Sequence, residues 1–211
     1  MSSAVRHRRR LTCRSGERGF SLLELIMIAG LVIVVSAIGF PLLTGLRERM
    51  RLSQAMREVE REIHQARQKA VTNNRAMRIR FNCPVAGQYR VVELIGNVSA
   101  HAAADNAADR CSTATYPYPA ADRDPATRPN LDGPVRRLDP ALRFGAVQTI
   151  EFWPDGSAHM NAGTTPWALL PVTGNAWTVT HTTVGFGGTS YTRTATLTVN
   201  GIGKIQIQQQ Q

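Results

Sequence analysis

The sequence predicts an α+β protein in which one long N-terminal helix precedes an antiparallel β-sheet. Two observations support this prediction. Hydrophobic residues recur at helical spacing as far as about Thr72, and from Ala76 onward they alternate with polar residues, as they do in strands. At 211 residues the chain is long enough for one ordinary domain together with an N-terminal extension.

The first part of the predicted helix is apolar on all sides. The 22 residues from Leu25 to Leu46 carry no formal charge, and a helix of this length reaches about 33 Å, enough to cross the hydrocarbon core of a bilayer. The run is longer than the roughly 7–15 apolar residues of a secretory signal peptide, although a plain signal anchor stays an alternative. Arginines flank both ends in similar numbers, so charge alone does not orient the segment.

The second part of the predicted helix is amphipathic. Its apolar residues follow one another at alternating spacings of four and three, which places them on one stripe: Leu52, Met56, Val59, Ile63, Ala66 and Ala70. Charged residues with i, i+3 and i, i+4 partners occupy the opposite face. We therefore expect one helix from Phe20 to about Thr72, ended by Asn73-Asn74 and loosened or kinked at Pro41.

Alternating segments after Asn74 predict six or seven antiparallel strands. The expected strands include 76–81, 89–95, 149–153, 176–184, 191–199 and 204–208. Turn residues separate them, notably Pro154-Asp155-Gly156 and the pair Asn200-Gly201, which is typical of a hairpin turn.

The segment 97–143 interrupts this pattern. It is rich in Ala, Asp, Pro and Arg, and so long a stretch without periodicity is unusual in a compact domain. We expect a long loop between strands, with a short helix near 101–108. A surface insertion without a role of its own is the alternative.

The positive charge of the chain is concentrated near its N-terminus. The formal net charge is +10, but residues 81–211 carry nine basic and nine acidic side chains. A basic surface that binds nucleic acid is therefore not indicated for the C-terminal part, because phosphate contacts need clustered positive charge.

Residues with catalytic or metal-binding chemistry are sparse. The histidines are scattered, and no zinc-binding, nucleophile-elbow or glycine-rich phosphate motif occurs. His101 and Asp105 have helical spacing, but two ligands do not make a metal site. The sequence thus predicts no enzyme, no cofactor and no metal.

Cys83 and Cys111 form an even pair beyond the basic leader, which itself contains Cys13. In an exported domain such a pair favours a disulfide, and closing about 29 residues would stabilise the fold by roughly 3–4 kcal/mol in the chain-entropy model. Two free thiols are the alternative.

The segment from Arg18 to Glu24 (RGFSLLE) resembles the class III signal of type IV prepilins and pseudopilins. The resemblance implies cleavage between Gly19 and Phe20 by a prepilin peptidase and methylation of the new Phe20 amine. Residues 1–19 would then be the leader and 20–46 the transmembrane and assembly helix. In that family the carboxylate at the position of Glu24 is an assembly residue and the proline at the position of Pro41 loosens the helix.

The body of the chain resembles the GspH/FimT pseudopilins. The matching positions are the Ala66-Arg67 pair on the helix, the strand and turn Ile150, Phe152 and Gly156, and the final Gly203-Lys204. The resemblance implies an amphipathic helix at 47–74 and a periplasmic, pilin-like β-rich head at 75–211. It also implies a bacterial inner-membrane location and three kinds of partner: other pilins or pseudopilins, the peptidase and an inner-membrane assembly platform.

Two functions follow from the resemblance. The first is a minor pseudopilin of a type II secretion pseudopilus. The alternative is a minor type IV pilin that serves pilus assembly or DNA uptake. DNA contact would fall to Arg193 and Lys204 near the last hairpin, and the balanced charge of the head disfavours it.

Overall fold

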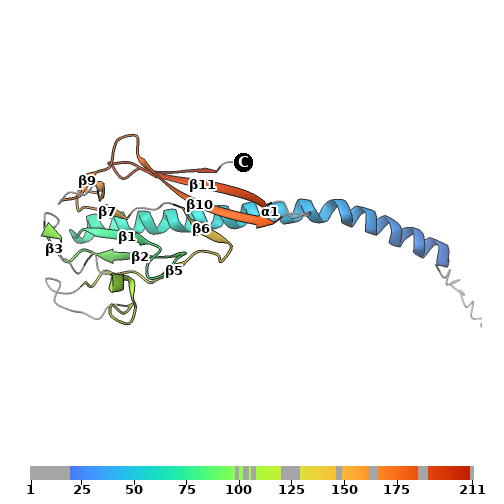
Figure 1. Cartoon of the computed structure of the whole chain (residues 1–211), viewed down its shortest axis with the longest axis horizontal. Coiled ribbons are helices and arrows are strands. Elements are labelled where there is room, and N and C mark those ends of the chain that lie inside the picture. The colour runs from blue at the N-terminus through green and yellow to red at the C-terminus, as the bar shows by residue number, and fades with distance from the viewer. Residues whose placement is uncertain are drawn as a thin grey trace, which may run out of the picture. The chain divides into compact units, whose positions relative to one another are not determined.

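The computed structural model describes residues 20–97, 100–101, 105, 108–119, 129–145, 149–161, 166–184 and 190–209. One long helix and antiparallel strands make the fold α+β, as predicted (Figure 1). The leader with Gly19 and the predicted turn at 185–188 lie outside the described residues. The chain divides into two compact units, Met1–Gly45 and Leu46–Gln211.

The helix α1 spans Leu22–Asn73 and is continuous through Pro41. At its C-terminal end Asn74 has a φ of 52°, and the Arg75 N–H donates to the Ala70 carbonyl at 3.2 Å. This pairing around a left-handed residue is a Schellman cap, which stops the helix where the two asparagines predicted it. By length and mean hydropathy, no helix within the described residues qualifies as a membrane span.

The strands follow α1 and are short apart from two near the C-terminus. Their bounds, together with those of the 3-10 helix η2, are β1 Met77–Phe81, β2 Gln88–Glu93, β3 Gly96–Asn97, β4 Ala100–His101, η2 Ala108–Cys111, β5 Arg136–Arg137, β6 Leu142–Phe144, β7 Ile150–Phe152, β8 Ala158–Met160, β9 Ala168–Leu169, β10 Asn175–Val184, β11 Ser190–Val199 and β12 Ile205–Gln209.

Among the described residues these strands pair into two main sheets and one small ribbon. The first sheet has the order β5-β2-β1-β7-β8-β9, the second has the order β12-β11-β10-β6, and β3 pairs with β4. Every described pairing is antiparallel.

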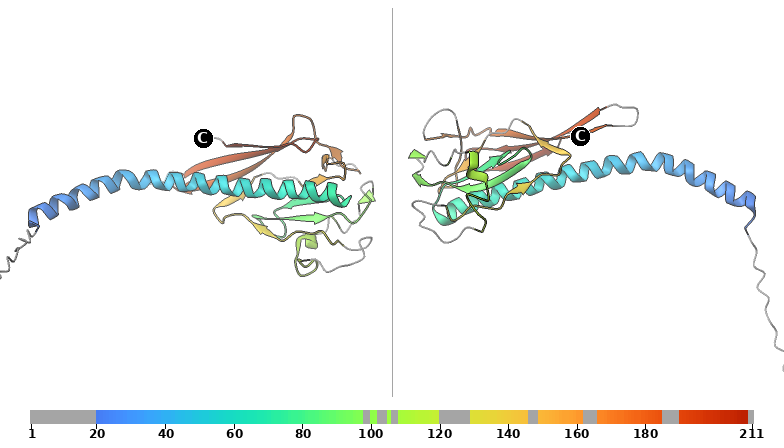
Figure 2. Two further views of the ribbon diagram at one scale, coloured as in Figure 1. Left: turned by 180° about the vertical axis from the view of Figure 1, so that it is seen from behind. Right: turned by 60° about the horizontal axis from the view of Figure 1, so that its bottom comes forward.

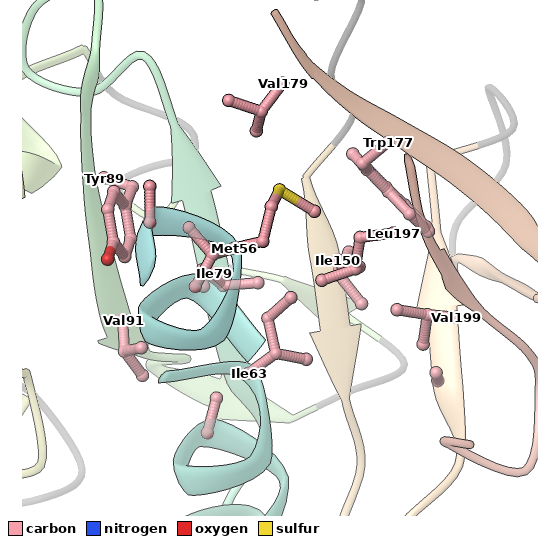
Figure 3. Packing of buried hydrophobic residues seen from close by; sticks show 14 of the residues in the cluster. Met56, Ile63, Ile79, Tyr89, Val91, Ile150, Trp177, Val179, Leu197 and Val199 are labelled. Atoms are coloured by element: carbon pink, nitrogen blue, oxygen red, sulfur yellow. The ribbon is translucent and has the colours of Figure 1, made fainter. Parts of the chain in front are cut away.

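The core lies where the second half of α1 meets both sheets. The predicted stripe from Leu52 to Ala70 is buried at every position, which confirms the amphipathic pattern. It packs against Ile79 and Ile150 of the first sheet and against Trp177 and Leu197 of the second (Figure 3). Both views in Figure 2 show this part of α1 running along strands of both sheets.

The prediction that 97–143 is a loop without strands was wrong. Besides β3 and β4, the segment contains η2, β5 and the start of β6. Within the predicted short helix at 101–108, Asp105 has 3-10 conformation and η2 begins at Ala108, while 102–104 and 106–107 lie outside the described residues. These pieces are too short to produce a periodic pattern, so the sequence could not reveal them.

Candidate functional site

The first half of α1 presents apolar side chains all around the helix. Large hydrophobic residues with at least half of their surface exposed occur at Leu22, Leu23, Leu25, Ile26, Met27, Ile28, Leu31, Val32, Ile33, Val34, Val35, Phe40 and Leu43. A helix that is hydrophobic on every side is stable only where something apolar surrounds it, since burying each such side chain contributes about 1.5–3 kcal/mol.

Glu24 lies in the first turn of this apolar half. The helix begins with the Leu25 N–H donating to the Ser21 carbonyl at 3.1 Å, and a carboxylate at this position interacts favourably with the N-terminal end of a helix. Glu24 is exposed, and among the described residues no side chain pairs with it. Its charge is therefore available to a group outside the described chain.

Arg67 of α1 joins the two turns that the family resemblance singled out. Its Nε donates to the Gly156 carbonyl at 3.0 Å and its Nη2 donates to the Ile202 carbonyl at 2.9 Å. A Cβ atom on Gly203 would lie 2.5 Å from Arg67 Nε and 2.8 Å from the Gly156 oxygen. The motif positions Arg67, Gly156 and Gly203, which are far apart in sequence, thus form one contact cluster, here named the Arg67 cluster.

The hairpin after β11 is present, but its turn differs from the prediction. Residues 200–204 form the connection, and the left-handed residue is Gly203, with a φ of 73°, rather than Gly201. The Asn200 side chain accepts from the Lys204 N–H at 2.8 Å, and the Gly203 N–H donates to the Asn200 carbonyl at 2.8 Å. The longer turn brings Gly203 beneath Arg67, which a two-residue turn would not do.

The face of β1 and β2 that carries the alternating arginines is largely buried. Arg78 is 1% exposed, and its Nε and Nη2 donate to Glu151 Oε2 at 3.1 and 2.9 Å. The Arg78 guanidinium also lies 4.0 Å from the centre of the Trp167 ring, and the Trp153 indole donates to Glu151 Oε1 at 2.7 Å. The charges are buried because they pair with each other.

The described residues between β4 and β5, at 105, 108–119 and 129–135, contact this face and are held by two further arginines. Arg90 donates to the carbonyls of Gly133 at 2.7 Å and Tyr116 at 2.8 Å. Arg110 donates through both terminal nitrogens to the Asp132 carboxylate. Burial lowers the pKa of Arg90, while the Asp132 carboxylate opposes that shift.

The predicted cysteine pair fastens the same segment. Cys83, just after β1, and Cys111, at the end of η2, form a disulfide with a Cα–Cα distance of 5.6 Å. Arg110 and Cys111 are adjacent, so covalent and ionic links hold the segment at one place.

A chain of hydrogen bonds follows the turn after β7. Ser157 Oγ lies 2.5 Å from Asp155 Oδ1 and 2.8 Å from His159 Nε2, and His159 Nδ1 lies 3.0 Å from the Trp167 carbonyl oxygen. The hydrogen bond from Ser157 lowers the pKa of Asp155. In a nucleophilic triad the histidine stands between serine and carboxylate. Here the serine stands between them, so this carboxylate cannot orient the imidazole.

A surface hollow of about 580 Å³ opens beside the Arg67 cluster. Its rim carries the exposed apolar side chains Leu169, Val172 and Ile202. Among the residues that the structure describes, no group of three or more His, Cys, Asp or Glu side chains could hold a metal ion.

The two basic residues predicted for weak DNA contact do not lie together. Arg193 is near the beginning of β11 and lies 3.8 Å from Glu48 of α1. Lys204 follows the end of that strand and is exposed. From Arg193 to Val199 the strand rises about 20 Å, so these two side chains do not form one basic patch.

Sequence reasoning identified the cysteines and the positions of the Arg67 cluster, but it missed Arg78, Glu151, Arg110 and Asp132. The alternation of arginine with apolar residues in β1 is the pattern of a half-exposed strand, and nothing local marks a covering segment.

A scan against protein-family models found no match, and searches of curated proteins and of solved structures found no similar protein.

Proposed function

We propose that this chain is a minor pseudopilin, a structural subunit of a type II secretion pseudopilus. One observation carries the proposal: the first half of α1 is apolar on every side and has a single carboxylate, Glu24, in its first turn. A filament whose subunits bundle such helices would cover the apolar surface, and the inner membrane would cover it before assembly.

Glu24 has a physical role in this proposal. Cleavage after Gly19 creates a cationic amine at Phe20, and a helix that enters the filament brings this amine near the carboxylate of a neighbour. Two opposite charges attract strongly in an apolar environment, and each is costly when left alone. The pair would therefore fix the axial register of neighbouring helices.

The head supports the proposal in two ways. The Arg67 cluster gathers the motif positions by which the body resembles the GspH/FimT pseudopilins. The apolar rim of the nearby hollow is a surface that contact with another subunit would cover.

Two experiments test the proposal: the first identifies the mature N-terminus, and the second follows the assembly of the variant Glu24→Gln. Mass spectrometry of the extracted protein should find a mature chain that begins at Phe20 and is heavier by one methyl group. Glu24→Gln keeps the side chain's size and the processing site, so we expect normal cleavage and membrane retention but poor incorporation into filaments. An unprocessed leader in cells with an active peptidase contradicts the family assignment. Wild-type incorporation of the variant contradicts the charge-pairing role alone.

A minor type IV pilin is the alternative, and the same tests apply to it. A role in DNA uptake would require an exposed basic surface on the head. The separation of Arg193 from Lys204 along β11, together with the ion pair between Arg193 and Glu48, argues against these residues as a DNA-binding pair. A gel-shift assay with the head and duplex DNA tests the DNA-uptake role.

A further inference from the structure

Exposed positive charge gathers on α1 at the beginning of the second compact unit. Arg47, Arg49 and Arg51 are all exposed, and they fall within one helical rise of about 6 Å. Since each residue turns the helix by about 100°, Arg49 points away from Arg47 and Arg51. The three arginines, here named the arginine group, thus lie on two opposite sides of the helix at nearly one level.

Glu48, the acidic residue among these arginines, contacts strands β10 and β11. Glu48 accepts from the Thr183 hydroxyl of β10 at 3.3 Å and lies 3.8 Å from Arg193 Nε of β11. These contacts tie the end of the β10–β11 pair to α1 and leave the arginines as the exposed charge. Arg51 has one further contact, at 4.0 Å from Asp139, and is itself 58% exposed on its side chain.

Apolar and aromatic side chains accompany the arginines. Leu46, Met50 and Tyr191 each have more than half of their surface exposed, and Tyr191 pairs with Thr183, the residue that contacts Glu48. Exposed arginines mixed with apolar and aromatic side chains are typical of protein surfaces that lie in the headgroup layer of a membrane.

We propose that the surface formed by Arg47, Arg49, Arg51 and Tyr191 binds an anionic phospholipid bilayer. A planar layer of phosphates can meet all three arginines because they lie on two opposite sides of the helix at nearly one level, whereas a rod-like nucleic acid would meet only one side. The inference rests on the proposed function in one respect: Arg47 directly follows the apolar segment 25–46, which would bring the arginine group to the membrane surface.

The test uses an N-acetylated fragment from Leu46 to Gln211, which contains every residue of the hydrophobic core and lacks the apolar half of α1. Co-sedimentation is measured with vesicles of phosphatidylcholine alone and of phosphatidylcholine with phosphatidylglycerol. Since each arginine near an anionic leaflet raises the affinity roughly fivefold, we expect about a hundredfold preference for the anionic vesicles at low salt, weakened by added salt.

The triple variant Arg47→Gln, Arg49→Gln, Arg51→Gln should lose this preference, and the same positions changed to Lys should keep it. The matched control Arg57→Gln, Arg61→Gln, Lys204→Gln removes equal charge from exposed positions elsewhere and should bind like the wild type. Equal binding to neutral vesicles, an equal loss in the control, or displacement by duplex DNA at equal phosphate concentration would overturn the inference. If the fragment fails this test while Phe20 is processed normally and Glu24→Gln enters filaments poorly, the inference about the lipid surface is rejected. The proposed function then stands.

Discussion

Arg67 Nε and the α-carbon of Gly203 are so close that a Cβ atom at Gly203 would lie 2.5 Å from that nitrogen. The same Nε donates to the Gly156 carbonyl, and Nη2 donates to the Ile202 carbonyl. One helix side chain therefore fixes two turns that belong to different sheets. The glycine is required both by the close approach and by its φ of 73°.

Gly203→Ala should destabilise the head more than the backbone conformation alone explains. A left-handed alanine costs about 1 kcal/mol, and the clash with Arg67 and the Gly156 carbonyl should raise the loss to roughly 2–4 kcal/mol. Gly87→Ala is the matched control, because Gly87 has a similar φ of 77° but nothing within 4 Å of its Cβ position. Urea unfolding of the fragment from Leu46 measures both; equal losses would mean that the close approach is unimportant.

Arg67→Lys should also destabilise the head, because one ammonium group cannot serve two carbonyls as a planar guanidinium does. Hydrogen bonds to charged donors contribute about 1.5–3 kcal/mol each, so we expect a loss of roughly 2 kcal/mol in urea unfolding. Arg57→Lys, at an exposed position of the same helix, should change the free energy of unfolding by less than about 0.5 kcal/mol. An unchanged free energy of unfolding for Arg67→Lys would show that the two turns keep their conformations without the guanidinium.

Arg78 and Glu151 should behave as a coupled buried pair. Arg78→Met leaves the Glu151 carboxylate buried without its cation, and we expect a loss of about 3–5 kcal/mol. Glu151→Gln should be costly for the converse reason. The double variant should lose clearly less than the sum of the two, which a double-mutant cycle in urea measures directly. Additive losses would indicate that each side chain relies on other partners.

The disulfide between Cys83 and Cys111 closes a sequence separation of 28 residues. In the chain-entropy model its loss costs about 3–4 kcal/mol, so Cys83→Ser, Cys111→Ser should lower the urea midpoint. Reduction of the wild-type fragment should lower it to the same level, which controls for the serine substitutions. We expect the Arg110 ion pair to keep residues 108–116 protected in hydrogen exchange. Complete loss of this protection after reduction would mean that the disulfide alone attaches the segment.

Asp155 should make stability depend on pH in the acid range. The hydrogen bond from Ser157 lowers the pKa of the Asp155 carboxyl from its ordinary value of 3.8. A lowered folded-state pKa means that the carboxylate stabilises the fold above the ordinary value, and that this contribution disappears as the pH falls through the folded-state pKa. Asp155→Asn should therefore be less stable than the wild type at pH 7 and should approach it in acid. A difference that is constant with pH would exclude this carboxylate as the cause.

The sequence by itself determined the long helix, its apolar and amphipathic halves and the positions of the longer strands. These features depend on spacings of three, four and two between neighbouring residues, and such spacings reflect the local geometry of the backbone. The six buried positions from Leu52 to Ala70 were predictable for this reason. The cysteine pair was predictable because two cysteines allow one internal pairing within the head.

Only the tertiary structure determined which charged residues are buried and which groups they pair with. Alternation placed Arg78 on the face opposite Ile79, but only the structure shows that Arg78 is buried and that Glu151, from a strand some seventy residues later, pairs with it. Arg67 likewise meets Gly156 and Ile202 only after both sheets have packed on α1. The partners of a buried charge are chosen by chain segments that are distant in sequence, and a local pattern contains no information about them.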